Sequence, residues 1–127
     1  MTDGRAKIVQ ALKDAGVSTV LFNQFEVPKN LPAAVVVLES ETGIRATARQ
    51  YTATDVGFTV YLIVNATKAI DPDSDLYELK EAFRAKYVAA LNRDFPRVEY
   101  YPSRTDGARE VRIAKIDLLK SGQGAAS

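Results

Sequence analysis

Residues 56–64 read VGFTVYLIV, and this stretch decides the fold because its side chains alternate as those of a β-strand do. The positions on one face are all apolar: Val56, Phe58, Val60, Leu62 and Val64. The other face carries Gly57, Thr59 and Tyr61, with Ile63 as an apolar exception. The pattern predicts a strand with one face in the core.

Upstream of this strand, residues 33–38 form a continuous apolar run, AAVVVL. Its length and its β-branched residues favour a buried central strand. Thr42-Gly43 is expected to turn the chain into a second, polar strand from Arg45 to Ala53. That strand has little to bury by itself, so we expect part of this hairpin to project beyond the core.

Two helices accompany these strands. Residues 71–92 form the stronger one, with Asp73 or Ser74 as its N-cap. Its predicted buried stripe is Leu76, Leu79, Phe83, Tyr87, Ala90 and Leu91. Its predicted solvent face is Glu78, Lys80, Glu81, Arg84 and Lys86. The other helix begins at Thr2 or Asp3 and ends before Gly16, a residue suited to the left-handed conformation after a helix.

The last strand, Arg109 to Leu119, changes the phase of its apolar residues, and a turn at Thr105-Asp106-Gly107 joins it to a strand from Arg97 to Tyr101. Its first apolar pair is Val111 and Ile113, at odd positions, and its second is Ile116 and Leu118, at even positions. A bulge near Ala114–Lys115 is expected to bring both pairs to one core.

The predicted order of elements, with a short strand at Ser18 to Phe22, is α-β-β-β-β-α-β-β. A chain of 127 residues normally makes one domain. We therefore predict a single α+β domain over residues 1–120, with a mixed, largely antiparallel sheet flanked by two helices. Residues 121–127, SGQGAAS, are expected to be a flexible tail.

The composition excludes several classes of site. The chain has no His, Cys or Trp, so it cannot build a Ser-His-Asp or Cys-His catalytic site or the usual zinc, haem or iron–sulfur centre. With 17 basic and 16 acidic residues, its net charge of +1 also argues against broad nucleic-acid binding. We expect no enzyme, no cofactor and no metal.

One acidic segment resembles the start of a calcium loop. Residues 71–75, DPDSD, have the D-x-D-x-D spacing, but Leu76 stands where the loop needs Gly and Ala82 where it needs a bidentate Glu. We interpret the segment as the acidic start of a helix.

The sequence also bears on location. The N-terminal residues MTDGR lack the apolar core of a signal peptide, and the longest apolar run, Leu31 to Leu38, is too short to span a membrane. We expect the chain to act in the cytoplasm or in an assembly that forms there.

Residues suited to protein contacts stand out more clearly than catalytic ones. Arg45, Arg49 and Tyr51 share one face of the polar strand, and Arg and Tyr are enriched at interfaces. The strand is either a docking surface, between identical subunits or with a partner, or an edge strand protected by charge. The other candidate contact residues are Tyr61, Asp73, Asp75, Tyr101 and Arg104.

Adjacent tyrosines on a strand face opposite ways, so at least one of Tyr100 and Tyr101 is expected to be exposed or in a contact. We expect the one that faces the helices to be buried and hydrogen-bonded.

Over residues 4–120 the chain resembles the tail terminator (tail completion) proteins of tailed bacteriophages. The resemblance lies in the order, lengths and texture of six segments: IVQALKDAG, KNLPAAVVVLESE, RATARQYTATD, FTVYLIV, DSDLYELKEAFRAKYVAAL and VEYYPSRTDGAREVRIAKIDLL.

The resemblance implies a structural ring, usually a hexamer, that caps the finished tail tube and offers the surface for head–tail joining. The implied partners are further copies of the chain, the tail tube protein, a neck or head–tail connector protein and, in a contractile tail, the sheath. DNA would be passing cargo and no membrane would be involved. The implied place is the tail or neck of the virion, after assembly in the host cytoplasm. The family has no catalytic residues.

Two other functions remain open from the sequence. One is a different neck component, such as a head–tail connector, or a tail assembly chaperone. The other is a small enzyme or ligand-binding domain that works with carboxylates, although no cluster in the sequence combines a nucleophile, a base and an orienting group.

Overall fold

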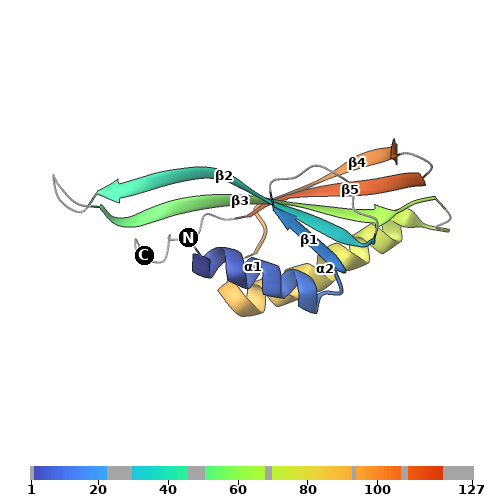
Figure 1. The fold of residues 1–127 in the computed structure, drawn as a ribbon. Coiled ribbons are helices and arrows are strands. Elements are labelled where there is room, and N and C mark those ends of the chain that lie inside the picture. The colour runs from blue at the N-terminus through green and yellow to red at the C-terminus, as the bar shows by residue number, and fades with distance from the viewer. Residues whose placement is uncertain are drawn as a thin grey trace.

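A computed structural model describes residues 2–22, 30–45, 51–67, 70–92, 94–106 and 109–118. It contains two helices and five strands (Figure 1). In chain order they are α1 (Thr2–Asp14), β1 (Thr19–Phe22), β2 (Ala33–Arg45), β3 (Tyr51–Asn65), α2 (Pro72–Leu91), β4 (Arg97–Asp106) and β5 (Arg109–Asp117). The predicted α+β single-domain fold is confirmed. The predicted tail, residues 121–127, lies outside the described residues.

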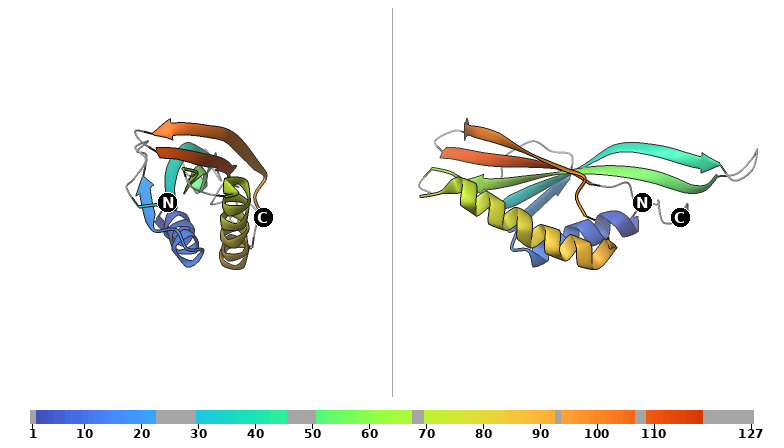
Figure 2. Two further views of the ribbon diagram at one scale, coloured as in Figure 1. Left: turned by 90° about the vertical axis from the view of Figure 1, so that its right-hand side faces the viewer. Right: turned by 180° about the vertical axis from the view of Figure 1, so that it is seen from behind.

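The five strands form one mixed sheet in the order β1-β2-β3-β5-β4. β1 pairs with β2 in parallel, and the other three pairings are antiparallel, so the sheet is largely antiparallel as predicted. Both helices lie side by side on one face of the sheet (Figure 2). The edges of the sheet are β1 and β4.

The predicted separate strand from Arg45 to Ala53 is wrong. No turn forms at Gly43, because Gly43 pairs with Thr54 within an uninterrupted run of pairs from Ser40↔Gly57 to Ile44↔Ala53. β2 instead runs on to Arg45 and β3 begins at Tyr51, so three strands rather than four precede α2. A glycine flanked by residues that pair well can remain in a strand, and that pairing is invisible to a local turn signal.

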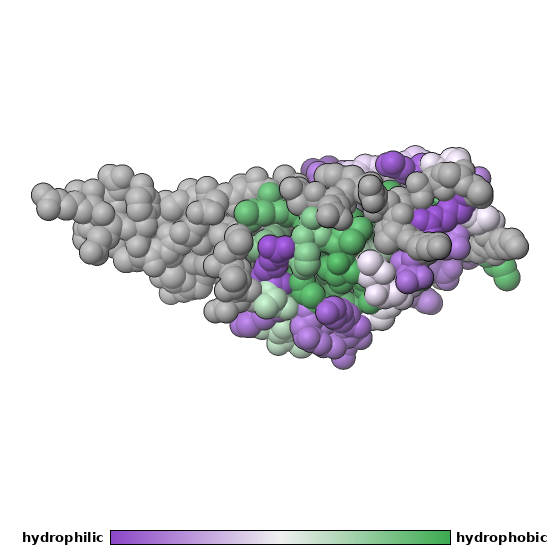
Figure 3. Space-filling model, in the orientation of Figure 1, coloured by the Kyte–Doolittle hydropathy of each residue, from purple (hydrophilic) through white to green (hydrophobic). Residues whose placement is uncertain are grey.

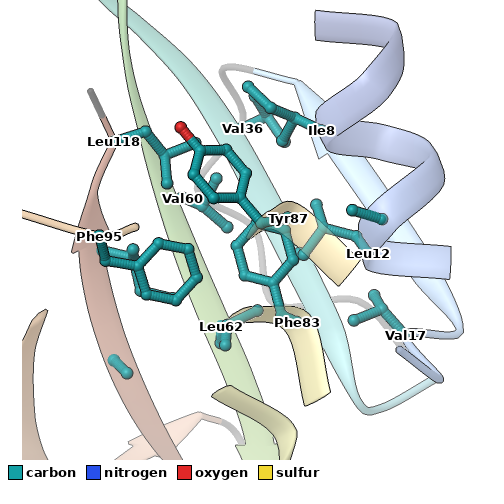
Figure 4. Packing of buried hydrophobic residues seen from close by; sticks show 14 of the residues in the cluster. Ile8, Leu12, Val17, Val36, Val60, Leu62, Phe83, Tyr87, Phe95 and Leu118 are labelled. Atoms are coloured by element: carbon teal, nitrogen blue, oxygen red, sulfur yellow. The ribbon is translucent and has the colours of Figure 1, made fainter. Parts of the chain in front are cut away.

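The main core lies between the helices and the sheet. Figure 4 shows its side chains from α1, α2 and the central strands pointing toward one another. Three aromatic rings pack at its centre, since the ring centroids of Phe83, Tyr87 and Phe95 lie 5.2–5.8 Å apart. Such tilted arrangements are favourable for aromatic pairs. This core fixes α2 against the sheet.

A second, smaller apolar cluster lies on the other face of the sheet. Its buried members are Val35, Val37, Ile63, Val111 and Ile113. This cluster explains both the unbroken AAVVVL run and the apolar exception at Ile63, because the central strands are buried on both faces.

The bulge predicted near Ala114–Lys115 is wrong for the same reason. The pairing of β3 with β5 runs in continuous register from Asn65↔Val111 to Thr59↔Asp117. The two apolar pairs of β5 therefore stay on opposite faces, each in its own cluster: Val111 and Ile113 on the outer face, and Ile116 with Leu118 on the helix side.

The ends of the helices follow capping rules. The N-cap of α2 is Asp71, not Asp73 or Ser74, and its carboxylate accepts a hydrogen bond from the Ser74 amide at 3.1 Å. Pro72 then occupies the first turn, where its missing N–H costs nothing. After α1, Gly16 has a φ of 104°, the left-handed conformation predicted for it.

The solvent face of α2 differs from the prediction at one residue. Lys80 is buried, and its ammonium nitrogen lies 3.8 Å from the centroid of the Tyr77 ring and 3.4 Å from the Glu81 carboxylate. A lysine can be buried in this way because its stem is apolar while its charge keeps a partner. Ala90, predicted in the buried stripe, is exposed.

The outer cluster makes a testable contribution to stability. Replacing the buried Ile113 in it (Ile113→Ala) is expected to lower the free energy of unfolding by about 2–5 kcal/mol, as for a core isoleucine, because it leaves a cavity. The neighbouring Lys115→Ala is the control and should stay within about 0.5 kcal/mol. Urea titration of both variants measures the difference; equal stabilities would mean that only the helix-side core holds the sheet.

Candidate contact surfaces

The most unusual feature of the fold is a two-stranded extension of β2 and β3. β1 pairs with β2 only at Ala33 to Val36, and β5 pairs with β3 only as far as Thr59. Among the described residues, 40–45 and 51–57 therefore pair only with each other. We call these residues the arm; Figures 1 and 2 show it projecting beyond both helices.

The arm has physical properties that favour contact with another protein. A two-stranded ribbon is marginally stable in water by itself. Both its outer edges carry backbone N–H and C=O groups that other strands of the described sheet do not pair. Residues 40–57 contain no proline that would block an edge. A partner that covered the arm would satisfy these groups.

Two of the three predicted arm residues come together in the structure. Arg45 and Tyr51 are register partners at the outer end of the arm. Arg49 belongs to the segment between them, which lies outside the described residues. The outer end of the arm thus places an arginine opposite a tyrosine on neighbouring strands.

The two adjacent tyrosines of β4 have exchanged their expected roles. Tyr100, on the same face as Val98 of the helix-side core, is 41% exposed. Tyr101 packs against the outer cluster, and its hydroxyl donates a hydrogen bond to the Glu99 carboxylate at 3.4 Å. The helices cover the middle of the sheet, whereas β4 lies at its edge, so a position on the helix side is not buried there.

The other candidate residues of the sheet lie apart from the arm. Tyr61 is half-buried, pairs in register with Lys115 and packs against the outer cluster, as Tyr101 does. Arg104 is exposed on β4, after the irregularity that follows Tyr101. The structure therefore brings Tyr61 and Tyr101 together and leaves Arg104 by itself on the edge strand.

The predicted acidic contact segment is partly engaged within the chain. Asp73 accepts a hydrogen bond from Nε of Arg112 at 2.7 Å, and the Arg112 guanidinium also donates to the Tyr101 carbonyl oxygen. Asp75 is exposed and, with Glu78, borders a cleft of about 440 Å³ between the end of α1 and the first turns of α2. Asp73 serves to tie α2 to the sheet.

Sequence reasoning missed a cluster where α2 meets β4. Arg84 lies 2.9 Å from the Glu81 carboxylate, and its Nε lies 3.0 Å from Asp94 at an angle too poor for a hydrogen bond. Burial raises the pKa of Tyr100, and the nearby Glu81 raises it further. The i, i+3 spacing of Glu81 and Arg84 indicated the ion pair, but nothing local indicated that Tyr100 lies beside it.

Neither a metal-binding cluster nor a membrane-spanning helix is found in the part of the chain that the structure describes. No group of three or more acidic side chains gathers there in a way that could hold a metal ion. No helix among these residues is long and apolar enough to cross a membrane.

Alkaline pH is expected to destabilise the protein. Burial, followed by the Glu99 charge, raises the pKa of Tyr101, and the neighbouring Tyr61 and Asp117 raise the pKa of Lys115. Above about pH 10, where Tyr101 and Lys115 lose their protons in the unfolded chain, the folded chain holds more protons, so the free energy of unfolding falls as the pH rises.

The variant Tyr101→Phe tests this expectation, because it removes one of the titrating groups and should make the fall shallower. Urea unfolding of the wild type and the variant at about pH 8 and about pH 11 measures both slopes. Identical slopes would assign the alkaline loss to other groups.

The chain matches no protein-family model, and no curated protein sequence matches it.

Proposed function

We propose that this chain is a subunit of a tail terminator ring, which closes the tail tube of a tailed bacteriophage and provides the surface for head–tail joining. The observation that carries the proposal is the arm, whose two strands extend past the rest of the described sheet, where no other described strand pairs with their outer edges. The resemblance of residues 4–120 to tail terminator proteins supports it.

In a ring, each subunit contacts one neighbour through one surface and the other neighbour through a different surface. The arm suits a ring because it can supply one of these two surfaces. An extension that leaves the globular part can reach over a subunit boundary or onto the tube below. The net charge of +1 fits the same role, because crowded copies repel one another little.

The proposal includes the partners that such a ring would have. These are further copies of the chain, the tail tube protein, a neck or head–tail connector protein and, in a contractile tail, the sheath. DNA would pass through without being held, since a chain of nearly balanced charge offers little net positive charge to its phosphates. The ring would assemble in the host cytoplasm and stay in the virion. No catalytic residue or cofactor takes part.

Purified protein mixed with tail tubes tests the proposal directly. Negative-stain images should show a ring at one end of each tube, without turnover of any substrate. The same arm would suit a head–tail connector or a tail assembly chaperone. Its position in the intact particle separates these: a terminator lies on the last tube ring, a connector lies nearer the head, and a chaperone is missing from the virion.

A shortened arm should separate folding from assembly. Residues 42–55 are replaced by Asn-Gly, a two-residue turn that fits between the register partners Glu41 and Val56. The free energy of unfolding should change by no more than about 1 kcal/mol, because the described residues among those removed pair with no strand outside the arm. Binding to tail tubes should weaken by at least about tenfold.

Thermal unfolding and co-sedimentation with tubes measure the two effects. The exposed-site variant Lys86→Glu, on α2, serves as a control for a surface change away from the arm. If the shortened protein binds tubes as strongly as the wild type does, the arm plays no part in tube binding and no longer supports the proposal.

A further inference from the structure

A cleft lies at the end of the β2–β3 ladder that is opposite to the arm. Its larger part holds about 440 Å³, where β2 begins and β3 ends, between the end of α1 and the first turns of α2. A hollow of about 490 Å³ adjoins this part, since Leu31 and Asn65 line both. We call the two parts together the end cleft. Figure 1 shows the arm and the start of α2 at opposite ends of the molecule.

The larger part of the end cleft combines an apolar lining with two carboxylates. Its apolar lining residues come from both helices, from β3 and from the start of β2: Ala15, Leu31, Pro32, Val64, Leu79 and Ala82. Asp75 and Glu78 of α2 border the same space. They are three residues apart, so their like charges are neighbours on the helix and repel each other. A cation bound between them would relieve this repulsion.

These two carboxylates differ from the others at the start of α2 in having no partner within the described chain. Asp71 caps the helix at the Ser74 amide, and Asp73 is held by Arg112. Asp75 and Glu78 are exposed, and their carboxylates form no hydrogen bond or ion pair with another residue in the described ranges. Both are therefore available to a ligand in the end cleft.

The lining favours an organic cation over a metal ion. Magnesium and calcium need several oxygen ligands, and no group of three acidic side chains that could hold a metal is found among the described residues. A lysine or arginine side chain instead joins an apolar stem to a cationic head, which matches the apolar lining and the two carboxylates. The volume of about 440 Å³ is typical of sites that hold more than one small group, so residues next to the cation also fit.

The adjoining hollow offers hydrogen-bonding groups suited to a peptide backbone. Ser18, Asn30 and Asn65 line it, and a hydroxyl and two amides can pair with backbone N–H and C=O groups. The Thr67 amide donates to Oδ1 of Asn65 at 2.9 Å, which orients that side chain and leaves its NH₂ group to donate. Figure 3 shows hydrophilic side chains among the described residues at this end of the molecule, whereas hydrophobic ones gather over β1.

We infer that the end cleft binds an extended segment of another protein that carries a lysine or an arginine. The stem of that side chain lies along the apolar lining, its cationic head meets Asp75 and Glu78, and the neighbouring backbone runs over the polar hollow. The inference rests on the proposed function only in naming this protein. If the arm faces the tail tube, the end cleft faces the neck, and the segment belongs to a neck or head–tail connector protein.

Short peptides with blocked ends test the class of ligand. The probes are the peptide AAKAA and its norleucine analogue, which keeps an aliphatic side chain without the charge. In an NMR titration of the isotope-labelled full chain, AAKAA should shift the amide signals of Val64, Asp75 and Glu78. The norleucine peptide and n-butylamine, which has a cation but no peptide backbone, should each bind at least about tenfold more weakly.

Each departure from this result counts against the inference. If AAKAA does not bind or shifts signals elsewhere, the end cleft is not a site for basic segments. If the norleucine peptide binds equally well, the carboxylates play no part. If n-butylamine binds as tightly as AAKAA, the cleft takes free amines, and the protein partner is wrong.

Variants of the full chain test the residues. The double variant Asp75→Asn with Glu78→Gln removes both charges at exposed positions and should weaken AAKAA binding at least about tenfold. Ala82→Leu narrows the cleft without changing the charge and should also weaken binding. Asp94→Asn is the control, because it removes a charge from the far end of α2, and it should bind as the wild type does. Thermal unfolding checks that each variant is folded; unchanged binding in the first two would overturn the inference.

Tube capping and head joining separate this inference from the proposed function. If AAKAA binds in the end cleft but the protein does not cap tail tubes, the cleft stands and the tail terminator function fails. If the double variant caps tubes and joins them to heads as well as the wild type does, the function stands and the inference about the end cleft fails.

Discussion

The antiparallel ladder between β2 and β3 is the constraint on which the rest of the structure depends. It runs from Ala33↔Ile63 to Arg45↔Tyr51. Its inner half is covered by apolar side chains on both faces and flanked by β1 and β5. Its outer half has none of these neighbours among the described residues and forms the arm. One pair of strands thus forms both the centre of the sheet and the arm that projects from it.

The sequence predicted most of the elements because their signals are local. The alternation of residues 56–64, the AAVVVL run and the acidic start of α2 each predicted an element that the structure contains. Gly16 was predicted correctly at the end of α1 because the left-handed backbone conformation that ends a helix strongly favours glycine.

The errors arose where the outcome depends on distant residues. Gly43 stays in a strand because Thr54 pairs with it, and β5 needs no bulge because a second cluster receives Val111 and Ile113. The bulge was predicted for a single core, whereas the central strands are buried on two faces.

The candidate contact residues show the same division between local and distant information. The register of the arm brings Arg45 to Tyr51, as residues near the end of one hairpin. Asp73 is held by Arg112 from β5, and Tyr100 is exposed because β4 is an edge strand. Those two outcomes depend on how α2 and β4 lie relative to the sheet, which no short stretch of sequence encodes.

The continuity of β2 and β3 also has a mechanical consequence. A pull along the arm, from its outer end toward a neighbouring protein, is transmitted through two unbroken strands into the buried half of the ladder. The hydrogen bonds that pair β2 with β1 and β3 with β5 cross the direction of such a load and resist it together, in shear, instead of opening one after another. If the extension were attached through a flexible linker, the linker would stretch before the force reached the domain. In this protein, tension on the arm is carried directly into the core.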